Sequence, residues 1–122
     1  ANDSMNMHVE LENGAVGVIH ASRMASGHIN DLSLRIFGTK GGLEVNFANN
    51  QSLLKACLGD DLDSGEWKNI EVPAVKSNYQ RFIEAIRAGV PVSPDFFRGA
   101  ELQKVLDAAL ESETEGSRNV AV

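Results

Sequence analysis

The chain has 122 residues, and its 43% hydrophobic content is enough for one compact domain with a single core. Its formal net charge of −6 arises from 17 acidic and 11 basic residues, and both kinds are dispersed along the sequence. Because no basic cluster appears, we expect no nucleic-acid partner, and because no long apolar run appears, we expect no membrane span. We treat residues 1–122 as a single domain.

The start of the sequence has no charged and then apolar leader, so we expect a cytoplasmic protein. It also lacks an initiator Met, so we expect a trimmed or partial chain. Cys57 is the single cysteine, which excludes an intrachain disulfide. The apolar run from Leu53 to Leu58 around it favours a small core side chain over a reactive thiol.

The first two-thirds of the sequence predicts strands. Apolar and polar residues alternate from Met5 to Leu11, as in a half-buried strand. Asn13-Gly14 favours a tight turn into a second strand, Ala15–Met24, whose two apolar faces indicate a central position in a sheet. Further strands are predicted at Leu32–Phe37, Leu43–Phe47, Ser52–Leu58 and Trp67–Val72, separated by turns at 38–42 and 48–51 and a polar loop at 59–65.

The last third predicts helices. Ser77 and Gln80 match a capping box, and apolar residues then repeat at helical spacing until Gly89 ends the helix. A second helix is predicted from Asp95 to Glu115, followed by a short final strand at Arg118–Val122. The buried stripe of this second helix is expected to comprise Leu102, Val105, Leu106, Ala109 and Leu110.

These elements predict the α+β class: an open, mainly antiparallel sheet of about six strands with two helices packed on one face. Helices on one face leave the other face uncovered, and the strand at Ala15–Met24 carries several apolar side chains. Such an exposed patch is larger than a monomer usually carries. We therefore expect a homo-oligomer assembled through the sheet face.

The candidate nucleotide, metal and nucleophile motifs are weak. The glycines at 38–42 lie between two strands and not at a strand-to-helix turn, so we interpret them as turn glycines. His8 and His20 have no acidic or cysteine partner at a metal-ligand spacing, which favours structural or surface roles. A hydrolytic pair of His20 and Ser22 lacks an identifiable orienting acid and oxyanion hole, and is the least favoured alternative.

The segment from Ser22 to Asp31 carries the most varied chemistry. It combines a cation, Arg23, with a proton carrier, His28, and an amide, Asn30, and it ends in a carboxylate. Such a set suits multidentate hydrogen bonding to the hydroxyls of a polyol. The alternative is an ordinary solvated connection between strands, and the residue chemistry alone favours that alternative.

Four motifs, taken in order, resemble the carboxy-terminal domain of the glucose–fructose oxidoreductase / inositol dehydrogenase family (Gfo/Idh/MocA). The stretch 13–23, NGAVGVIHASR, resembles its second-strand hairpin, and 34–43, LRIFGTKGGL, resembles its strand-turn-strand. The stretches 82–89, FIEAIRAG, and 105–112, VLDAALES, resemble two of its helices. Together the motifs span residues 13–112.

The resemblance implies a parent dehydrogenase with an amino-terminal Rossmann domain, NAD or NADP as cofactor, and a sugar or polyol substrate. It implies that this domain helps wall the substrate site and builds oligomer interfaces. The family's catalytic lysine stands in a Glu-Lys-Pro motif, which this sequence lacks. Its acid/base Asp and His usually precede the hairpin seen here. No catalytic, cofactor-binding or metal-binding residue is therefore carried over to this chain.

Two classes of function stay open. In the first, the chain is the substrate-wall and oligomerisation domain of an NAD(P)-dependent oxidoreductase and is inactive alone. Arg23, His28 and Asn30 are then the expected substrate-binding residues, at the rim of the parent's cleft. In the second, the chain is a stand-alone binding or assembly module without enzymatic activity.

Overall fold

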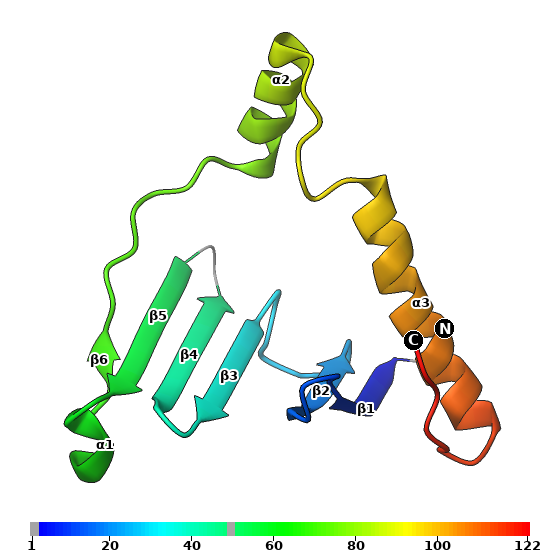
Figure 1. The fold of residues 1–122 in the computed structure, drawn as a ribbon, viewed down its shortest axis with the longest axis horizontal. Helices are drawn as coiled ribbons and strands as arrows, with labels where there is room; N and C mark the ends of the chain where they lie inside the picture. The colour runs from blue at the N-terminus through cyan, green and yellow to red at the C-terminus, as the bar shows by residue number, and fades with distance from the viewer. Residues whose placement is uncertain (1–2, 49–50) are drawn as a thin grey trace. The chain divides into compact units, whose positions relative to one another are not determined.

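Residues 3–48 and 51–122 are described from a computed structural model of the chain (Figure 1). They fall into two compact units. The first contains the described residues up to Met5 together with Ala21–Ala74, and the second contains Asn6–His20 and Val75–Val122.

The described residues form six strands and three helices, and the α+β class is confirmed (Figure 1). The strands divide between a two-stranded sheet, β1-β2, and a four-stranded sheet, β3-β4-β5-β6, where the sequence predicted one sheet. The strands are β1 (Ser4–Glu10), β2 (Val16–Ser22), β3 (Leu32–Gly38), β4 (Gly41–Ala48), β5 (Gln51–Leu58) and β6 (Lys68–Asn69). The helices are α1 (Asp61–Ser64), α2 (Asn78–Ala88) and α3 (Phe96–Thr114).

The turn between β1 and β2 forms where the sequence predicts it. Gly14 has a positive φ of 81°, and the amide of Leu11 donates to the carbonyl of Ala15 at 2.8 Å. The predicted central position of the second strand is wrong, because among the described residues β2 neighbours only β1. Val16 is 82% exposed. Two apolar faces indicate that a strand needs cover on both sides, but they do not indicate how many strands pair with it.

The four-stranded sheet has one mainly apolar face and one face crossed by a charged row. Antiparallel pairing aligns Leu34 with Val45, and Val45 with Leu54. Since side chains alternate along a strand, this row and its neighbours share one face. That apolar face comprises Leu32, Leu34, Ile36, Leu43, Val45, Phe47, Leu54 and Ala56. The opposite face carries a row of Arg35, Glu44 and Lys55, in which Nε of Arg35 lies 3.3 Å from Oε2 of Glu44.

The small core of the first unit lies beside β5. Cys57 is buried, and its thiol donates to the carbonyl oxygen of Asp61 at 3.3 Å, which confirms it as a core side chain. The helix α1 lies in the predicted polar loop at 59–65, where the sequence did not indicate one. The predicted strand at Trp67–Val72 is reduced to the two residues of β6. The predicted turn at 38–42 joins β3 and β4, while residues 49–50 of the other predicted turn lie outside the described residues.

The caps of α2 form as predicted, and α3 also has an N-cap. Ser77 Oγ accepts from the amide of Gln80 at 3.2 Å, and Gln80 Oε1 accepts from the amide of Ser77 at 2.9 Å, so the capping box is complete. Gly89 ends α2 with a left-handed φ of 65°. Asp95 caps α3 by accepting from the amide of Arg98 at 2.9 Å. The packing of both helices on a sheet face stays a prediction.

Two predictions for the end of the chain are wrong. The leucines of the α3 stripe are exposed, with Leu106 at 46%. Segment 118–122 forms no strand; instead Ser112 donates to the carbonyl of Arg118 at 2.7 Å, and Arg118 pairs with Glu111 at 2.7 Å. These polar contacts hold the backbone back against the end of α3, away from any strand. No helix within 3–48 or 51–122 has both the length and the apolarity to cross a bilayer.

Candidate functional site

Hydrogen bonds hold the start of the loop between β2 and β3, residues 23–31. The amide of Arg23 donates to the carbonyl oxygen of Asp3 at 2.7 Å, which continues the strand pairing by one further bond. The next amide, that of Met24, donates to Oγ of Ser22 at 3.1 Å. Ser22 Oγ also shares a 2.7 Å hydrogen bond with Oγ of Ser4. The loop therefore leaves the sheet in a direction that three hydrogen bonds set.

Backbone conformation shapes the rest of the loop. The amide of His28 donates to the carbonyl of Ala25 at 3.1 Å across a turn in which Gly27 has a φ of 83°. A positive φ at this turn position favours glycine, as in a type II turn. Asn30 also has a positive φ, 48°, a conformation that asparagine tolerates better than most residues. The two positive-φ positions lie on either side of Ile29, so the chain reverses between His28 and Asp31.

This reversal brings His28 and Asp31 into contact. Nδ1 of His28 lies 2.6 Å from Oδ2 of Asp31, and the two side chains are 62% and 26% exposed. The carboxylate is thus the more enclosed partner, and the imidazole faces solvent. The sequence alone places a carboxylate at the end of this segment but does not indicate its role. The sequence does carry a signal for this contact: Asp31 follows His28 by three residues, and Asn30, which tolerates a positive φ, lies between them.

The three predicted substrate residues lie on this one loop of the first unit. Arg23, His28 and Asn30 are all exposed. Within the described residues, the guanidinium of Arg23 and the amide group of Asn30 have no hydrogen-bond or ion-pair partner in the protein, so both are available to a ligand. The loop therefore presents a cation, a polarised imidazole and an amide, and only the imidazole is held by another side chain.

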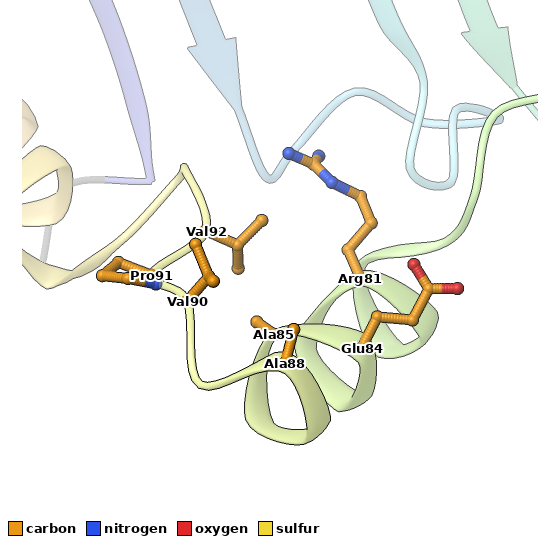
Figure 2. Close-up of a pocket in the computed structure, with 7 residues that line it drawn as sticks. All are labelled: Arg81, Glu84, Ala85, Ala88, Val90, Pro91 and Val92. Atoms are coloured by element: carbon orange, nitrogen blue, oxygen red, sulfur yellow. The ribbon is translucent and has the colours of Figure 1, made fainter.

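Two hollows of the surface lie outside this loop. One hollow, of about 310 Å³, lies between α2 and the connector that follows it. Figure 2 shows Ala85 and Ala88 of the helix on the side of Val90 and Val92. Arg81, also at this hollow, donates to the carbonyl oxygen of Ser93. A second hollow lies at the β1–β2 turn. Apart from Arg81 and Glu84, the side chains that line the first hollow are apolar, and loop 23–31 lines neither of the two hollows.

The alternative chemistries suggested by the sequence find no support in the geometry. Ser22 shares its hydroxyl with Ser4 and the amide of Met24, so it is not aligned with His20 as a nucleophile would be. No three His, Cys, Asp or Glu side chains within 3–48 and 51–122 gather as a metal site.

The glycines at 38–42 do not fit a nicotinamide cofactor. They form the turn between two antiparallel strands, with Gly38 opposite Gly41. A Cβ atom at Gly41 would lie 2.2 Å from the carbonyl oxygen of Cys57, and one at Gly42 would lie 2.7 Å from the ring of Trp67. The space that side chains would take at these glycines is therefore filled by other atoms of the protein and is not left for a phosphate group.

Comparison with known proteins supplies the family. Residues 1–122 match the family model described as the C-terminal alpha/beta domain of the Gfo/Idh/MocA oxidoreductase family. A levoglucosan dehydrogenase from Pseudarthrobacter phenanthrenivorans is 28% identical over 131 aligned residues. The alignment covers 90% of this chain and 34% of that relative, so the chain spans about a third of the relative's length. No solved structure gives a significant match. The chain belongs to the Gfo/Idh/MocA oxidoreductase family, as its C-terminal alpha/beta domain.

Proposed function

We propose that this chain walls the substrate site of an NAD(P)-dependent oxidoreductase acting on a sugar or polyol, and that loop 23–31 contacts substrate hydroxyls. One observation carries the proposal: a loop with a hydrogen-bonded backbone presents exposed donors and acceptors in a domain of an oxidoreductase family. A relative named for levoglucosan, a sugar with several hydroxyl groups, supports this substrate class.

The side chains of the loop suit hydroxyl groups, because a hydroxyl both donates and accepts hydrogen bonds. The guanidinium of Arg23 only donates, the amide of Asn30 does both, and His28 offers a ring nitrogen of either kind. A ligand whose hydroxyls form hydrogen bonds with all three side chains is recognised by the positions of these hydroxyls as well as by their number. An apolar or singly charged ligand would leave most of these groups without a partner, at a cost in affinity.

The rest of the parent polypeptide supplies the nicotinamide site and the catalytic acid–base groups. The aligned third of the relative leaves ample length for a Rossmann domain, which is this domain's partner. The 122-residue chain is accordingly inactive alone. We keep the cytoplasmic location expected from the sequence, and fractionation of cells that express the full-length protein tests it.

The test uses the full-length enzyme. Levoglucosan and a panel of sugars and polyols are offered with NAD⁺ or NADP⁺, and the absorbance of the reduced nicotinamide is followed. With the best substrate, His28→Ala and Asn30→Ala should each lower kcat/KM about tenfold, the effect of one lost hydrogen bond. The KM for the nicotinamide and the oligomer size should not change.

The matched control is Asp63→Ala, an exposed residue of α1 outside the loop, which should leave kcat/KM unchanged. If His28→Ala and Asn30→Ala retain full kcat/KM, or if they dissociate the oligomer, the substrate role is wrong. A full-length protein that binds the panel sugars in calorimetry but reduces neither nicotinamide would favour the binding module instead.

We also propose that the parent enzyme self-associates through the apolar face of the four-stranded sheet. The observation in favour is a mainly apolar surface across three strands, with Ser52 at one end of it, on which Leu34 is 55% exposed, opposite a face with a charged row. An exposed surface of this kind is typical of an interface. The copies would then bury the apolar face and leave Arg35 and Glu44 in solvent.

Light scattering on the full-length protein tests the assembly. Leu34→Glu should shift the mass toward the monomer, while Ser33→Glu, on the opposite face of the same strand, should not. If Leu34→Glu lowers the melting temperature without changing the mass, the chain's own helices cover this face and the proposed interface is wrong.

A further inference from the structure

The contact between His28 and Asp31 has a consequence for how the loop binds its ligand. We infer that Asp31 is a positioning residue that fixes the tautomer of His28, so that Nε2 of His28 accepts a hydrogen bond from one substrate hydroxyl. The inference rests on the proposed function of loop 23–31. It assigns Asp31 a role that acts only through the imidazole.

The tautomer follows from the chemistry of the contact. An ionised carboxylate has no hydrogen to donate, so the 2.6 Å contact between Asp31 Oδ2 and His28 Nδ1 requires the proton to lie on Nδ1. In the neutral ring, Nε2 then carries the lone pair and is an acceptor. Nε2 makes no hydrogen bond within the described residues, and the side chain is 62% exposed. The acceptor is therefore free and faces solvent.

The backbone holds the carboxylate in place. Asp31 is followed directly by β3, whose first residue, Leu32, is paired with Phe47. The positive φ of Asn30 turns the chain so that the carboxylate reaches back over three residues to the ring. On the other side, the amide of His28 is bonded to the carbonyl of Ala25. Both ends of the pair are therefore anchored by backbone hydrogen bonds.

A fixed acceptor selects for a donor. Nε2 in this tautomer can accept from a hydroxyl but offers nothing to an ether oxygen or a carbonyl oxygen. The pair therefore favours a free alcohol at one position of the substrate and disfavours analogues in which that hydroxyl is methylated or removed. The neighbouring Arg23 only donates, so it cannot replace this acceptor.

A double-mutant cycle in the full-length enzyme tests the inference, with levoglucosan, or the best sugar of the panel, as the probe. His28→Ala should lower kcat/KM about tenfold and Asp31→Ala about fivefold, mainly through KM because the contact is made in the ground state. The double variant should lose no more than His28→Ala alone, since Asp31 acts through the ring. The control Asp63→Ala should change nothing.

A second variant provides a rescue. The amide oxygen of His28→Gln accepts a hydrogen bond without help from a carboxylate, so His28→Gln should recover part of the lost activity. Asp31→Ala in that background should have no further effect. If Asp31→Ala does not fold, Asp31→Asn keeps the volume and can present either oxygen or nitrogen to the ring, and about a threefold loss is expected.

Analogues complete the experiment. Among singly O-methylated or deoxygenated levoglucosans, one should already show the tenfold loss with the unmodified enzyme and should lose no more with Asp31→Ala or His28→Ala. Equal losses from Asp31→Ala with and without His28 would overturn the inference while leaving the substrate loop in place. Full activity of His28→Ala would overturn the inference, and full activity of Asn30→Ala as well would overturn the proposed function.

Discussion

The indole ring of Trp67 covers the backbone of Gly42, so closely that a Cβ atom there would lie 2.7 Å from Cη2 of the ring. The same Cβ would lie 3.2 Å from Cδ1 of Phe37. The rings of Phe37 and Trp67 meet edge to face, with centroids 6.5 Å apart and an interplanar angle of 87°. A glycine at the start of β4 therefore allows two aromatic side chains to close over the strand.

This arrangement predicts that Gly42→Ala destabilises the chain by about 1–3 kcal/mol, because the added methyl group must displace the ring of Trp67. Denaturant unfolding measures the change in the free energy of unfolding. Trp67 is the single tryptophan, so its fluorescence in the folded state also reports the displacement. Gly41→Ala should cost more, since its φ is 134° and its Cβ would meet the backbone oxygen of Cys57, which cannot rotate away. Equal stability of Gly42→Ala and the unmodified chain would mean that the ring moves aside freely.

Replacing Gly99, inside α3, with alanine is expected to stabilise the chain, unlike the two substitutions above. A Cβ atom at Gly99 has nothing within 4 Å, and the residue lies in a helix. Gly99→Ala should therefore raise the free energy of unfolding by about 0.5–1 kcal/mol, because alanine loses less backbone entropy on folding and has the higher helix propensity. Denaturant unfolding and the helical signal in circular dichroism check this. A loss of stability would show that the space at Gly99 is filled in the folded chain.

Features encoded over a few residues could be predicted from the sequence. The turn at Asn13-Gly14, the capping box of Ser77 and Gln80, and the end of α2 at Gly89 each depend on residues within one turn. For the same reason the strand order of β3, β4 and β5 followed from the short connections between them. Asn30 is the exception among local signals, because its positive φ was not anticipated and Asp31 was therefore left without a role.

Features that depend on distant residues could not be predicted. Hydrophobic periodicity predicted a buried stripe on α3, but it did not show whether anything covers Leu106, which is exposed. The apolar faces of β2 did not show that the strand has one neighbour among the described residues. The sequence predicted a strand that begins at Arg118, yet the contact of Arg118 with Glu111 holds segment 118–122 against the end of α3. In each case the outcome is set by which partner lies nearby, and a local pattern does not specify a partner.

The ion pair of Lys68 and Asp61 predicts a pH dependence. Nζ of Lys68 lies 2.5 Å from Oδ1 of Asp61, and this hydrogen bond is the main cause that raises the pKa of Lys68 above its ordinary value of 10.5. A raised folded pKa means that the contribution to stability is fully present below the unfolded pKa and is lost as pH rises through the folded one. The melting-temperature difference between the unmodified chain and Lys68→Met should therefore be constant near neutral pH and should shrink above 10.5. A difference that grows in that range would contradict the assignment.

The stripe of α3 supplies the last prediction. Leu106 is 46% exposed in this chain, so Leu106→Ala removes contacts from a half-buried side chain and should cost only about 1 kcal/mol in the free energy of unfolding of the 122-residue chain. In the full-length protein, where a further surface can cover the stripe, the same substitution should cost about 2–5 kcal/mol, as in a closed core.

Lys104→Ala, at an exposed residue of the same helix, is the control and should be near neutral in both proteins. Denaturant unfolding of both proteins measures the two costs. A large cost in the short chain would mean that its own residues bury Leu106, whereas equal small costs in both would mean that the stripe stays in solvent. Only a cost that rises in the longer protein agrees with a helix whose apolar face is covered by residues outside this chain.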